Sequence, residues 1–281
     1  MDNSQVVRDF QLRVFLLEES QEGTILPWSA QLAAAKRFDM SPAQVEACAL
    51  ELGVMPARYQ RNRQTISTSR QLRLFRSRVA IIGCGGLGGY LIEELSRLGV
   101  GHLTLIDPDV FEEHNLNRQI LSSLDVIGCP KVDVAAERVR DINPAVTVAS
   151  LRTAFSPDNG TELLEGADVV LDGLDNVATR LALAHACREM AIPLVHGAIG
   201  GWYGQLAVQL PGEDISRCLA GTNGATKGVE TTHGNPSFTP AVVASLQVAA
   251  ACKILVKQDH NSGQGMLFVN LLDMEMERLD V

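Results

Sequence analysis

Apolar and polar positions between residues 78 and 210 fall into blocks that predict strands and helices in alternation. Val79–Ile82 is a short, wholly apolar run, typical of a central parallel strand covered on both faces. Leu87–Leu98 has helical spacing, and Gly99 provides a stop. Leu103–Ile106 predicts a second buried strand. The alternation continues with a helix at about 130–141, a strand at 146–151, a helix at 157–165, a strand at 168–172 and a helix at 177–190.

After residue 190 the pattern predicts a change in strand direction. Pro193–Ala198 is the next strand, and the glycine-rich turn 200–204 leads into an antiparallel strand, Gln205–Leu210. The stretch 212–236 has little periodicity and predicts a mobile loop. A buried helix at Pro240–Val256 and a last strand at Met266–Leu271 follow. We therefore predict an α/β fold with a doubly wound, Rossmann-like, mainly parallel sheet and antiparallel C-terminal strands.

Residues 1–57 predict an N-terminal helical extension to a domain that covers residues 58–281. Ser29–Phe38 has a helical pattern, and Ser41, with Gln44 three positions later, forms a capping box that opens a second helix ending at Gly53. Ser67–Phe75 predicts a helix that leads into the first strand. The basic run 58–64 before it is most simply a solvated face.

Composition narrows the classes of partner. The chain has 281 residues, 46% of them hydrophobic, enough for a sizeable core. The net charge of −9 argues against a general binder of nucleic acid or membrane surfaces, since both favour positive charge. The polar start Met1–Gln5 does not resemble a signal peptide, so we expect a cytoplasmic protein. The six cysteines form no C-x-x-C pair, so we expect reduced, mostly buried thiols.

A glycine-rich turn joins the first predicted strand to its helix. Gly83, Gly85 and Gly88 match G-x-G-x-x-G, in which the glycines allow a tight turn, phosphate approach and close packing of helix on strand. A phosphate would lie at the helix N-terminus. Asp107 ends the next strand about 20 residues after Gly88, where a ribose-binding acid is expected. This unit predicts nucleotide binding without identifying the nucleotide.

Polar residues follow two strands of the predicted sheet. Asp107 and Asp109 lie just past one strand, and Asp175, with Asn176, lies just past another. Such acids hold ribose or a metal, although ordinary turns and helix caps explain them as well. Lys131 begins a helix, where it opposes the dipole, so either a bound phosphate or simple solvation accounts for it. Together with Arg118 these residues suit a polyphosphate with Mg²⁺.

Further motifs occur in the order and spacing of one family. They are Arg63-Gln64, the loop 83–89, the segments 105–109 and 115–119, Gly128-Cys129-Pro130-Lys131, Leu174-Asp175-Asn176 with Arg180, and Ser245-Leu246-Gln247. Over about residues 58–281 the chain resembles the ThiF/MoeB/HesA adenylyltransferases, relatives of the ubiquitin-activating enzymes. The resemblance implies ATP-dependent adenylation of the C-terminal glycine of a small ubiquitin-like or sulfur-carrier protein, with release of pyrophosphate.

The resemblance also implies roles for individual residues. Asp107 would take the ribose, Asp175 would hold Mg²⁺, and Arg63 would reach into the site of a partner subunit, so a homodimer is implied. Catalytic roles fall to Arg63, Arg118, Lys131 and Asp175. The implied nucleotide-binding residues are Gly83, Gly85, Gly86, Gly88, Asp107, Asp109, Asn115, Arg118, Gln119, Lys131 and Asn176.

The sequence departs from the family pattern at its cysteines. Many relatives carry two C-x-x-C pairs for zinc; here the first is reduced to Ile215–Cys218 and the second is missing, so we predict no zinc. Relatives also place a cysteine in the loop before the Ser-Leu-Gln helix, but the segment Val229–Gly234 has none. Cys218 is left as the one loop cysteine available for a covalent role.

Three alternatives stay open at this stage. The same ATP chemistry could act on a peptide or on a carboxylate carried by RNA. The glycine loop alone would also suit an NAD-dependent oxidoreductase. A degenerate, binding-only member is the non-enzymatic alternative, and the retained Arg63, Arg118, Lys131 and Asp175 argue against it. The pathway is not encoded in the motifs.

Overall fold

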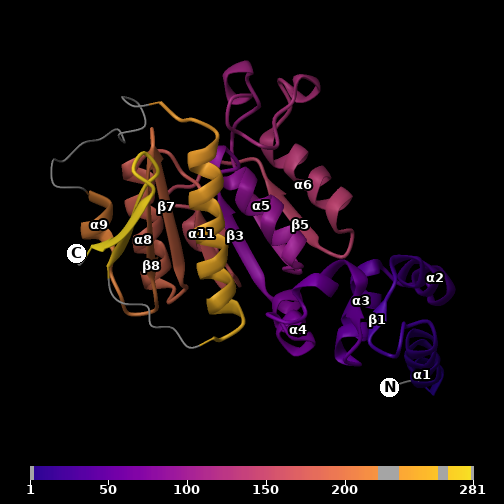
Figure 1. The fold of residues 1–281 in the computed structure, drawn as a ribbon. Coiled ribbons are helices and arrows are strands. Elements are labelled where there is room, and N and C mark those ends of the chain that lie inside the picture. Colours follow the sequence, from indigo (N-terminus) through magenta and orange to yellow (C-terminus); the bar gives the residue numbers. More distant parts are fainter. Residues whose placement is uncertain (1–2, 221–233, 259–264, 280–281) are drawn as a thin grey trace.

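An eight-stranded sheet organises the larger part of the computed structural model, which describes residues 3–220, 234–258 and 265–279 (Figure 1). The strand order is β10-β9-β8-β7-β6-β3-β4-β5, with parallel pairing from β7 to β5 and antiparallel pairing from β7 to β10. The predicted fold class is confirmed. The strands are β3 (Arg78–Ile82), β4 (His102–Ile106), β5 (Thr147–Leu151), β6 (Val169–Asp172), β7 (Leu194–Gly200), β8 (Tyr203–Gln209), β9 (Met266–Asn270) and β10 (Glu275–Leu279).

Helices cover both faces of this sheet, because its buried strands are apolar on both sides. One core joins α5 (Gly86–Leu98), α6 (Lys131–Ile142) and α11 (Phe238–Leu255) to side chains such as Ile81 and Leu105. The other joins α7 (Gly160–Leu163), α8 (Val177–Glu189) and α9 (Ser216–Ala220) to Ile82 and Val170. Helix α11 is long and apolar enough to cross a membrane, but here it packs on α5, β7 and β8.

Three predictions differ from the structure. Met266–Leu271 was expected to be the last strand, but β10 follows it. Strand β10 is an exposed edge strand in which three of the five residues are charged, so it has no apolar run to reveal it. The helix predicted at 157–165 is only α7, because Asn159 Oδ1 accepts from the Ser156 amide and holds the preceding residues in a turn. The expected loop 212–236 contains α9, and its residues 221–233 lie outside the described part of the chain.

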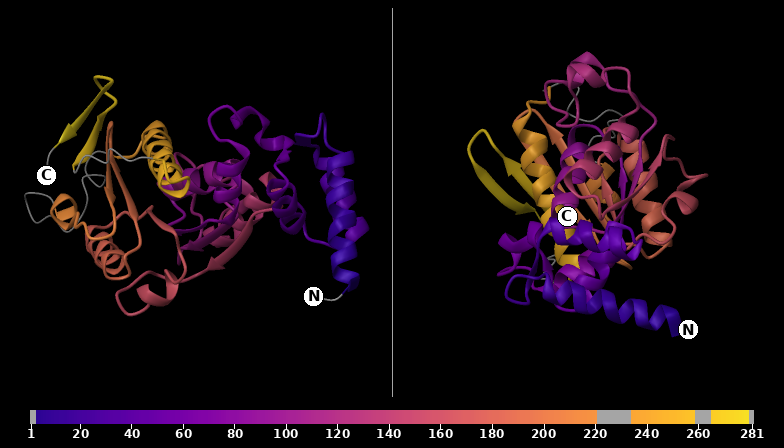
Figure 2. Two further views of the ribbon diagram at one scale, coloured as in Figure 1. Left: turned by 90° about the horizontal axis from the view of Figure 1, so that it is seen from below. Right: turned by 90° about the vertical axis from the view of Figure 1, so that its right-hand side faces the viewer.

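The N-terminal residues form a helical unit at the other end of the sheet from the segment that follows β4 (Figures 1 and 2). The capping box is confirmed, since Ser41 Oγ accepts from the Gln44 amide and Gln44 Oε1 accepts from the Ser41 amide. The first helix was not predicted. The unit comprises α1 (Asn3–Glu18), β1 (Ile25–Leu26), α2 (Trp28–Phe38), α3 (Pro42–Glu51) and β2 (Met55–Pro56), followed by η1 (Ala57–Asn62) and α4 (Thr68–Arg76).

A buried polar network joins this unit to the sheet domain. Glu46, fully buried, accepts from Arg58 Nη1 at 2.6 Å and from the Tyr59 hydroxyl at 2.7 Å. Asn143, which ends α6, donates to the Tyr59 hydroxyl at 2.7 Å and accepts from Arg58 at 2.6 Å. The interpretation of the basic run as a solvated face is therefore wrong for Arg58, which the fold draws into an ion pair.

Candidate nucleotide-binding site

The glycine loop joins β3 to α5 with contacts that no side chain would allow. Gly83 has φ = +95°, and a Cβ there would lie 2.7 Å from the Gly173 carbonyl oxygen. A Cβ on Gly88 would lie 1.8 Å from the Gly83 carbonyl oxygen. The first turn of α5 therefore packs directly on the end of β3. Gly85 caps this helix, whose unpaired amides create a positive end.

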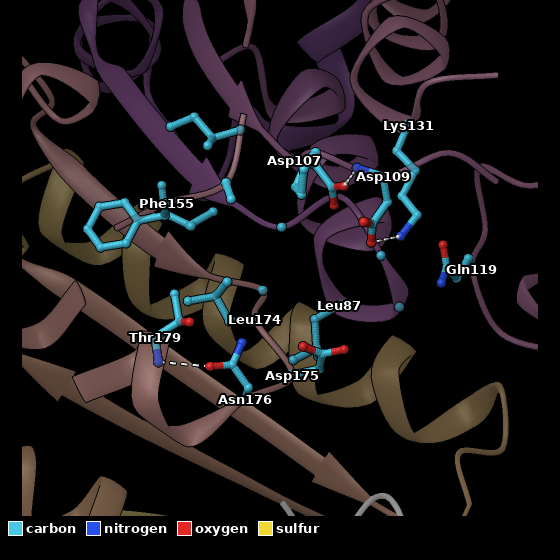
Figure 3. A pocket seen from close by; sticks show the side chains of 18 of the residues that line it. Leu87, Asp107, Asp109, Gln119, Lys131, Phe155, Leu174, Asp175, Asn176 and Thr179 are labelled. Atoms are coloured by element: carbon cyan, nitrogen blue, oxygen red, sulfur yellow. Dashed lines mark hydrogen bonds and ion pairs between the residues drawn. The ribbon is translucent and has the colours of Figure 1, made fainter. Parts of the chain in front are cut away.

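A cavity of about 550 Å³ opens at the carboxyl ends of β3, β4 and β6, where strand order reverses (Figure 3). Its walls are polar on one side and apolar on the other. Predicted site residues that line it are Gly83, Gly85, Gly86, Asp107, Asp109, Arg118, Gln119, Lys131, Asp175 and Asn176.

Asp107 organises the first two turns of the site. Its side chain is 5% exposed; Oδ2 accepts from the Cys84 amide at 2.7 Å, and Oδ1 accepts from the Asp109 amide at 2.8 Å. The carboxylate thus ties the glycine loop to the turn after β4. Burial raises the pKa of Cys84, and the Asp107 charge adds to this effect, so this thiol stays protonated.

Lys131 and Asp109 form an ion pair at the edge of the cavity. The Lys131 ammonium lies 2.9 Å from Asp109 Oδ2, and the Lys131 side chain is 8% exposed whereas that of Asp109 is 63% exposed. Solvation therefore does not explain why a lysine lies at the N-terminus of this helix. A phosphate that entered the cavity would compete with an exposed carboxylate for a buried cation that is already in place.

Arg118 and Gln119 arrive from the segment after β4. Half-buried Arg118 donates through Nη1 to the His114 carbonyl and to Asn117 Oδ1. Gln119 is 6% exposed, and its buried Oε1 has no hydrogen-bond partner among the described residues. An unpaired buried acceptor costs free energy, which makes Gln119 a candidate contact for a ligand or its metal.

Asp175 and Asn176 have different roles at the start of α8. Asn176 Oδ1 accepts from the Thr179 amide at 2.8 Å and so provides the N-cap. Asp175 is exposed and lines the cavity, across from Asp107 and Asp109 in Figure 3. Helix capping therefore explains Asn176 but not Asp175.

A buried polar cluster supports the turn that carries Asp175. Asp172 Oδ2 lies 2.6 Å from His196 Nδ1, and both side chains are 1% exposed. Asp172 Oδ1 accepts from the Leu174 amide, while Arg180 Nη2 donates to the Leu174 carbonyl at 2.6 Å. Gln247 donates to the backbone carbonyl of Asp172. Four elements thus hold one turn in place.

Three predicted residues do not line the cavity. Gly88 has the packing role described above. Asn115 is 4% exposed and uses Oδ1 to accept from the Glu112 amide, so its side chain stabilises the local turn instead of facing the cavity. Arg63 is exposed at the end of η1 and is absent from the lining of its own subunit's cavity.

Several lining residues were missed from the sequence. Phe155, Leu174 and Thr179 form the side of the cavity that suits a flat, apolar group, and Phe155 lies opposite Lys131 in Figure 3. Phe155 follows β5, so its place near a carboxyl strand end was available as a signal. Asn235 lines the cavity too, next to residues 221–233 outside the described structure.

Metal and thiol chemistry have specific candidates here. Among the described residues no three His, Cys, Asp or Glu side chains group as a metal site. Mg²⁺, however, commonly takes one or two protein carboxylates together with substrate phosphates, and exposed Asp175 fits that requirement. Cys218 lies on α9 and not in a loop, and burial raises its pKa, which disfavours a reactive thiolate.

Comparison with known proteins identifies relatives of this chain. The model of the ThiF family matches residues 59–281. The chain is 39% identical over 210 residues to a SAMP-activating enzyme E1 from Haloferax volcanii, covering 74% of this chain and 77% of the relative. It is 34% identical to a sulfur carrier protein adenylyltransferase from Thermus thermophilus, covering 75% and 81%. It spans only 62% of the Arabidopsis thaliana adenylyltransferase and sulfurtransferase MOCS3.

Solved structures share the fold. Escherichia coli MccB with succinimide superposes with a TM-score of 0.68 at 20% identity, covering 89% of this chain and 82% of that one. The E. coli tRNA N6-threonylcarbamoyladenosine dehydratase TcdA, in complex with ATP, has a TM-score of 0.62 at 26% identity, covering 72% and 94%.

Proposed function

This chain belongs to the ThiF family, and we propose that it is an ATP-dependent adenylyltransferase that activates the C-terminal glycine of a small ubiquitin-like or sulfur-carrier protein. The observation that carries the proposal is one cavity in which a helix N-terminus, Lys131 and Arg118 face an exposed Asp175. Two relatives of this chain are named for activating such carriers. An NAD-dependent oxidoreductase would need neither the second cation nor the exposed acid.

In this proposal the apolar side of the cavity receives the base and the polar side receives the phosphates. Phe155 and Leu174 contact the adenine, and Asp107 lies near the ribose. Amides at the start of α5 bind phosphate oxygens. Lys131 leaves Asp109 for the triphosphate, and Arg118 adds a second positive charge. Mg²⁺ held by Asp175 would neutralise further charge on the phosphates.

The proposed reaction needs positioning and charge neutralisation more than acid–base chemistry. The carrier's terminal carboxylate oxygen forms a bond to the α-phosphorus, and the bond from that phosphorus to the bridging oxygen breaks. Pyrophosphate leaves with that electron pair, so no proton has to move. Lys131 and Arg118 stabilise charge on the phosphates as the bonds exchange. No side-chain nucleophile is required.

We propose that the carrier docks beside an exposed aromatic pair at the edge of the cavity. Trp202 and Phe238 are 45% and 38% exposed, with ring centroids 4.6 Å apart. Thr239 Oγ1 donates to the Gly201 carbonyl, which holds the two segments together next to the lining residue Asn235. Exposed aromatic side chains are frequent anchors in interfaces.

ATP–pyrophosphate exchange with the full chain tests the proposal. Exchange should require Mg²⁺ and a folded carrier that ends in Gly-Gly, and Trp202→Ala should raise the carrier KM while leaving ATP binding unchanged. A matched variant, Trp28→Ala, alters an exposed tryptophan in the distant helical unit and should leave the carrier KM unchanged. Failure of exchange with every such carrier, using folded protein that binds ATP, would contradict the proposed substrate.

Arg63 can be tested as a residue that acts across a homodimer. If it serves the partner's site, mixing Arg63→Ala with Asp175→Ala subunits rebuilds one intact site in each mixed dimer. A statistical mixture of two-fold dimers would then recover roughly a quarter of wild-type exchange. If Arg63 acts within its own subunit, the mixture stays inactive. Mixing two preparations of the same variant is the control.

A second candidate keeps the ATP chemistry and changes the acceptor. The similarity to MccB and TcdA favours it, because the TcdA structure is named for a tRNA modification and another MccB structure is named as a complex with MccA. The carboxylate would then belong to a peptide or to RNA. Radiolabelled ATP with each acceptor class separates the two, because only the true acceptor yields pyrophosphate in proportion to its concentration.

A further inference from the structure

Helix α1 carries an apolar stripe that no described residue covers. Its inner face contributes Leu12 and Leu16, 2% and 0% exposed, to the core of the helical unit. Its outer face carries four large apolar side chains that are 36–67% exposed. They are Val7, Phe10, Val14 and Leu17.

The four outer residues have the spacing of a coiled-coil seam. They are separated by three, four and three positions, which places valine at both a positions and Phe10 and Leu17 at d. At 3.6 residues per turn they fall within about 80° of the helix circumference, on the far side from Leu12 and Leu16. β-Branched residues at a with Leu at d favour two-stranded parallel pairs.

Charges beside the seam complement a second copy of the same helix. Arg13 occupies g and Glu18 occupies e, and in a parallel pair g of one helix faces the following e of its partner. Two symmetric Arg13–Glu18 pairs would form. An antiparallel pairing of the same apolar residues would bring g against g, and so place Arg13 beside Arg13 of the second copy, where like charges repel. Among the described residues Arg13 forms an exposed ion pair with Glu51 at 3.7 Å, a type of pair that contributes little to stability.

The position of α1 leaves room for this contact. The helix forms the outer edge of the molecule in both views of Figure 2. Because the stripe and the buried face lie on opposite sides of the helix, two copies joined through their stripes keep their bodies apart. The helix is already held by its packing in the monomer, so association does not bear the cost of helix nucleation.

We propose that α1 self-associates in parallel with α1 of a second copy of this chain, through Val7, Phe10, Val14 and Leu17 and the Arg13–Glu18 pairs. This contact lies in the helical unit, at the other end of the sheet from the catalytic cavity, and is independent of the proposed adenylation (Figure 1). It links the carrier-activating domains of two subunits, or of two dimers if a second interface joins the sheet domains.

Sedimentation velocity of the full chain tests the charge complementarity. Arg13→Glu and Glu18→Arg should each weaken association at least about tenfold, and the double variant should restore it, since the swapped charges pair again. Glu19→Arg makes the same charge change one position outside the seam and should have no effect. Circular dichroism checks that each variant folds. Unchanged assembly in both single variants, or no recovery in the double variant, overturns the proposal.

Cross-linking distinguishes the parallel arrangement from other occupants of the stripe. In a parallel pair Val14 faces Val14 of the partner subunit, so Val14→Cys should form a bismaleimide cross-link between identical peptides, found by peptide mass mapping. Gln11→Cys should form far less. Phe10→Glu should abolish the association through α1 while ATP–pyrophosphate exchange per subunit persists. A stripe that cross-links only to an added carrier, or inserts only into lipid vesicles, would overturn self-association.

Discussion

The cavity and the junction beneath the helical unit are both built from polar residues far apart in the sequence, yet they differ in how their groups are satisfied. At the junction, Glu46, Arg58, Tyr59 and Asn143 bond to one another within the chain. In the cavity, Asp175 is exposed and Gln119 Oε1 has no described partner. A closed network stabilises the fold, whereas an open set of polar groups is prepared for a ligand.

Glu46→Ala should produce the largest loss of stability. It leaves the half-buried Arg58 guanidinium without its carboxylate, and removing one partner of a buried pair costs about 3–5 kcal/mol. Urea denaturation measures this as a fall in the free energy of unfolding. Glu51→Ala, which breaks the exposed pair with Arg76, should cost no more than about 1 kcal/mol. Equal losses of unfolding free energy for the two variants would show that the buried network at the junction contributes no more than an exposed ion pair.

Asp175→Ala should reduce activity strongly and leave stability nearly unchanged. Exchange should fall at least about 100-fold, equivalent to about 2.7 kcal/mol, because the exposed acid acts only when nucleotide is bound. The midpoint of thermal unfolding should stay within about 2 °C of the wild-type value, since the Asp175 side chain is exposed. Full exchange in this variant would show that Asp175 has no role in catalysis.

His196→Ala tests the cluster below the cavity, which belongs to the fold and to the site at once. Loss of the bond to buried Asp172 should cost about 1–3 kcal/mol in unfolding free energy. The turn carrying Asp175 should also loosen, so the Mg²⁺ concentration for half-maximal exchange should rise. His196→Asn offers a side-chain amide that can donate to Asp172 and should recover part of both losses. If stability falls but the Mg²⁺ dependence of exchange is unchanged, the cluster stabilises the fold and does not position Asp175.

Asn176→Ala should lower stability and leave ATP–pyrophosphate exchange nearly unchanged. Loss of an N-cap costs about 1 kcal/mol, measured by urea denaturation, while the nearby carboxylate remains in place. Exchange should change less than about fivefold when assayed well below the unfolding temperature. A comparable loss of exchange in Asn176→Ala and Asp175→Ala would contradict the assignment of helix capping to Asn176 and of ligand contact to Asp175.

Asp109→Asn should have the smallest effect. Its carboxylate is 63% exposed, so the ion pair with Lys131 contributes less than about 1 kcal/mol to stability. Because Lys131 is then released from a competing charge, we expect a lower KM for ATP by steady-state exchange. A higher KM would instead show that Asp109 itself contacts the nucleotide.

Much of the sheet and of the cavity could be predicted, because their signals are local in the chain. The apolar run before Gly83, the glycine spacing and the acid that ends β4 each report a neighbouring stretch of backbone. His196 carried no comparable signal, since its role arises from Asp172 on another strand. Strand β10 stayed hidden as well, because an exposed edge strand is held by backbone hydrogen bonds and needs no apolar pattern.

The sequence alone determined the order of strands and helices from β3 to β8, the turn that only glycine can make, and the capping box at Ser41, because each depends on residues within a few positions of one another. Only the tertiary structure decided which polar groups meet. It paired Arg58 with Glu46, bonded Asn115 to the Glu112 amide outside the cavity lining, and left Asp175 in that lining. The physical reason is that hydrogen-bond satisfaction depends on three-dimensional neighbours, which the local pattern of a chain does not contain.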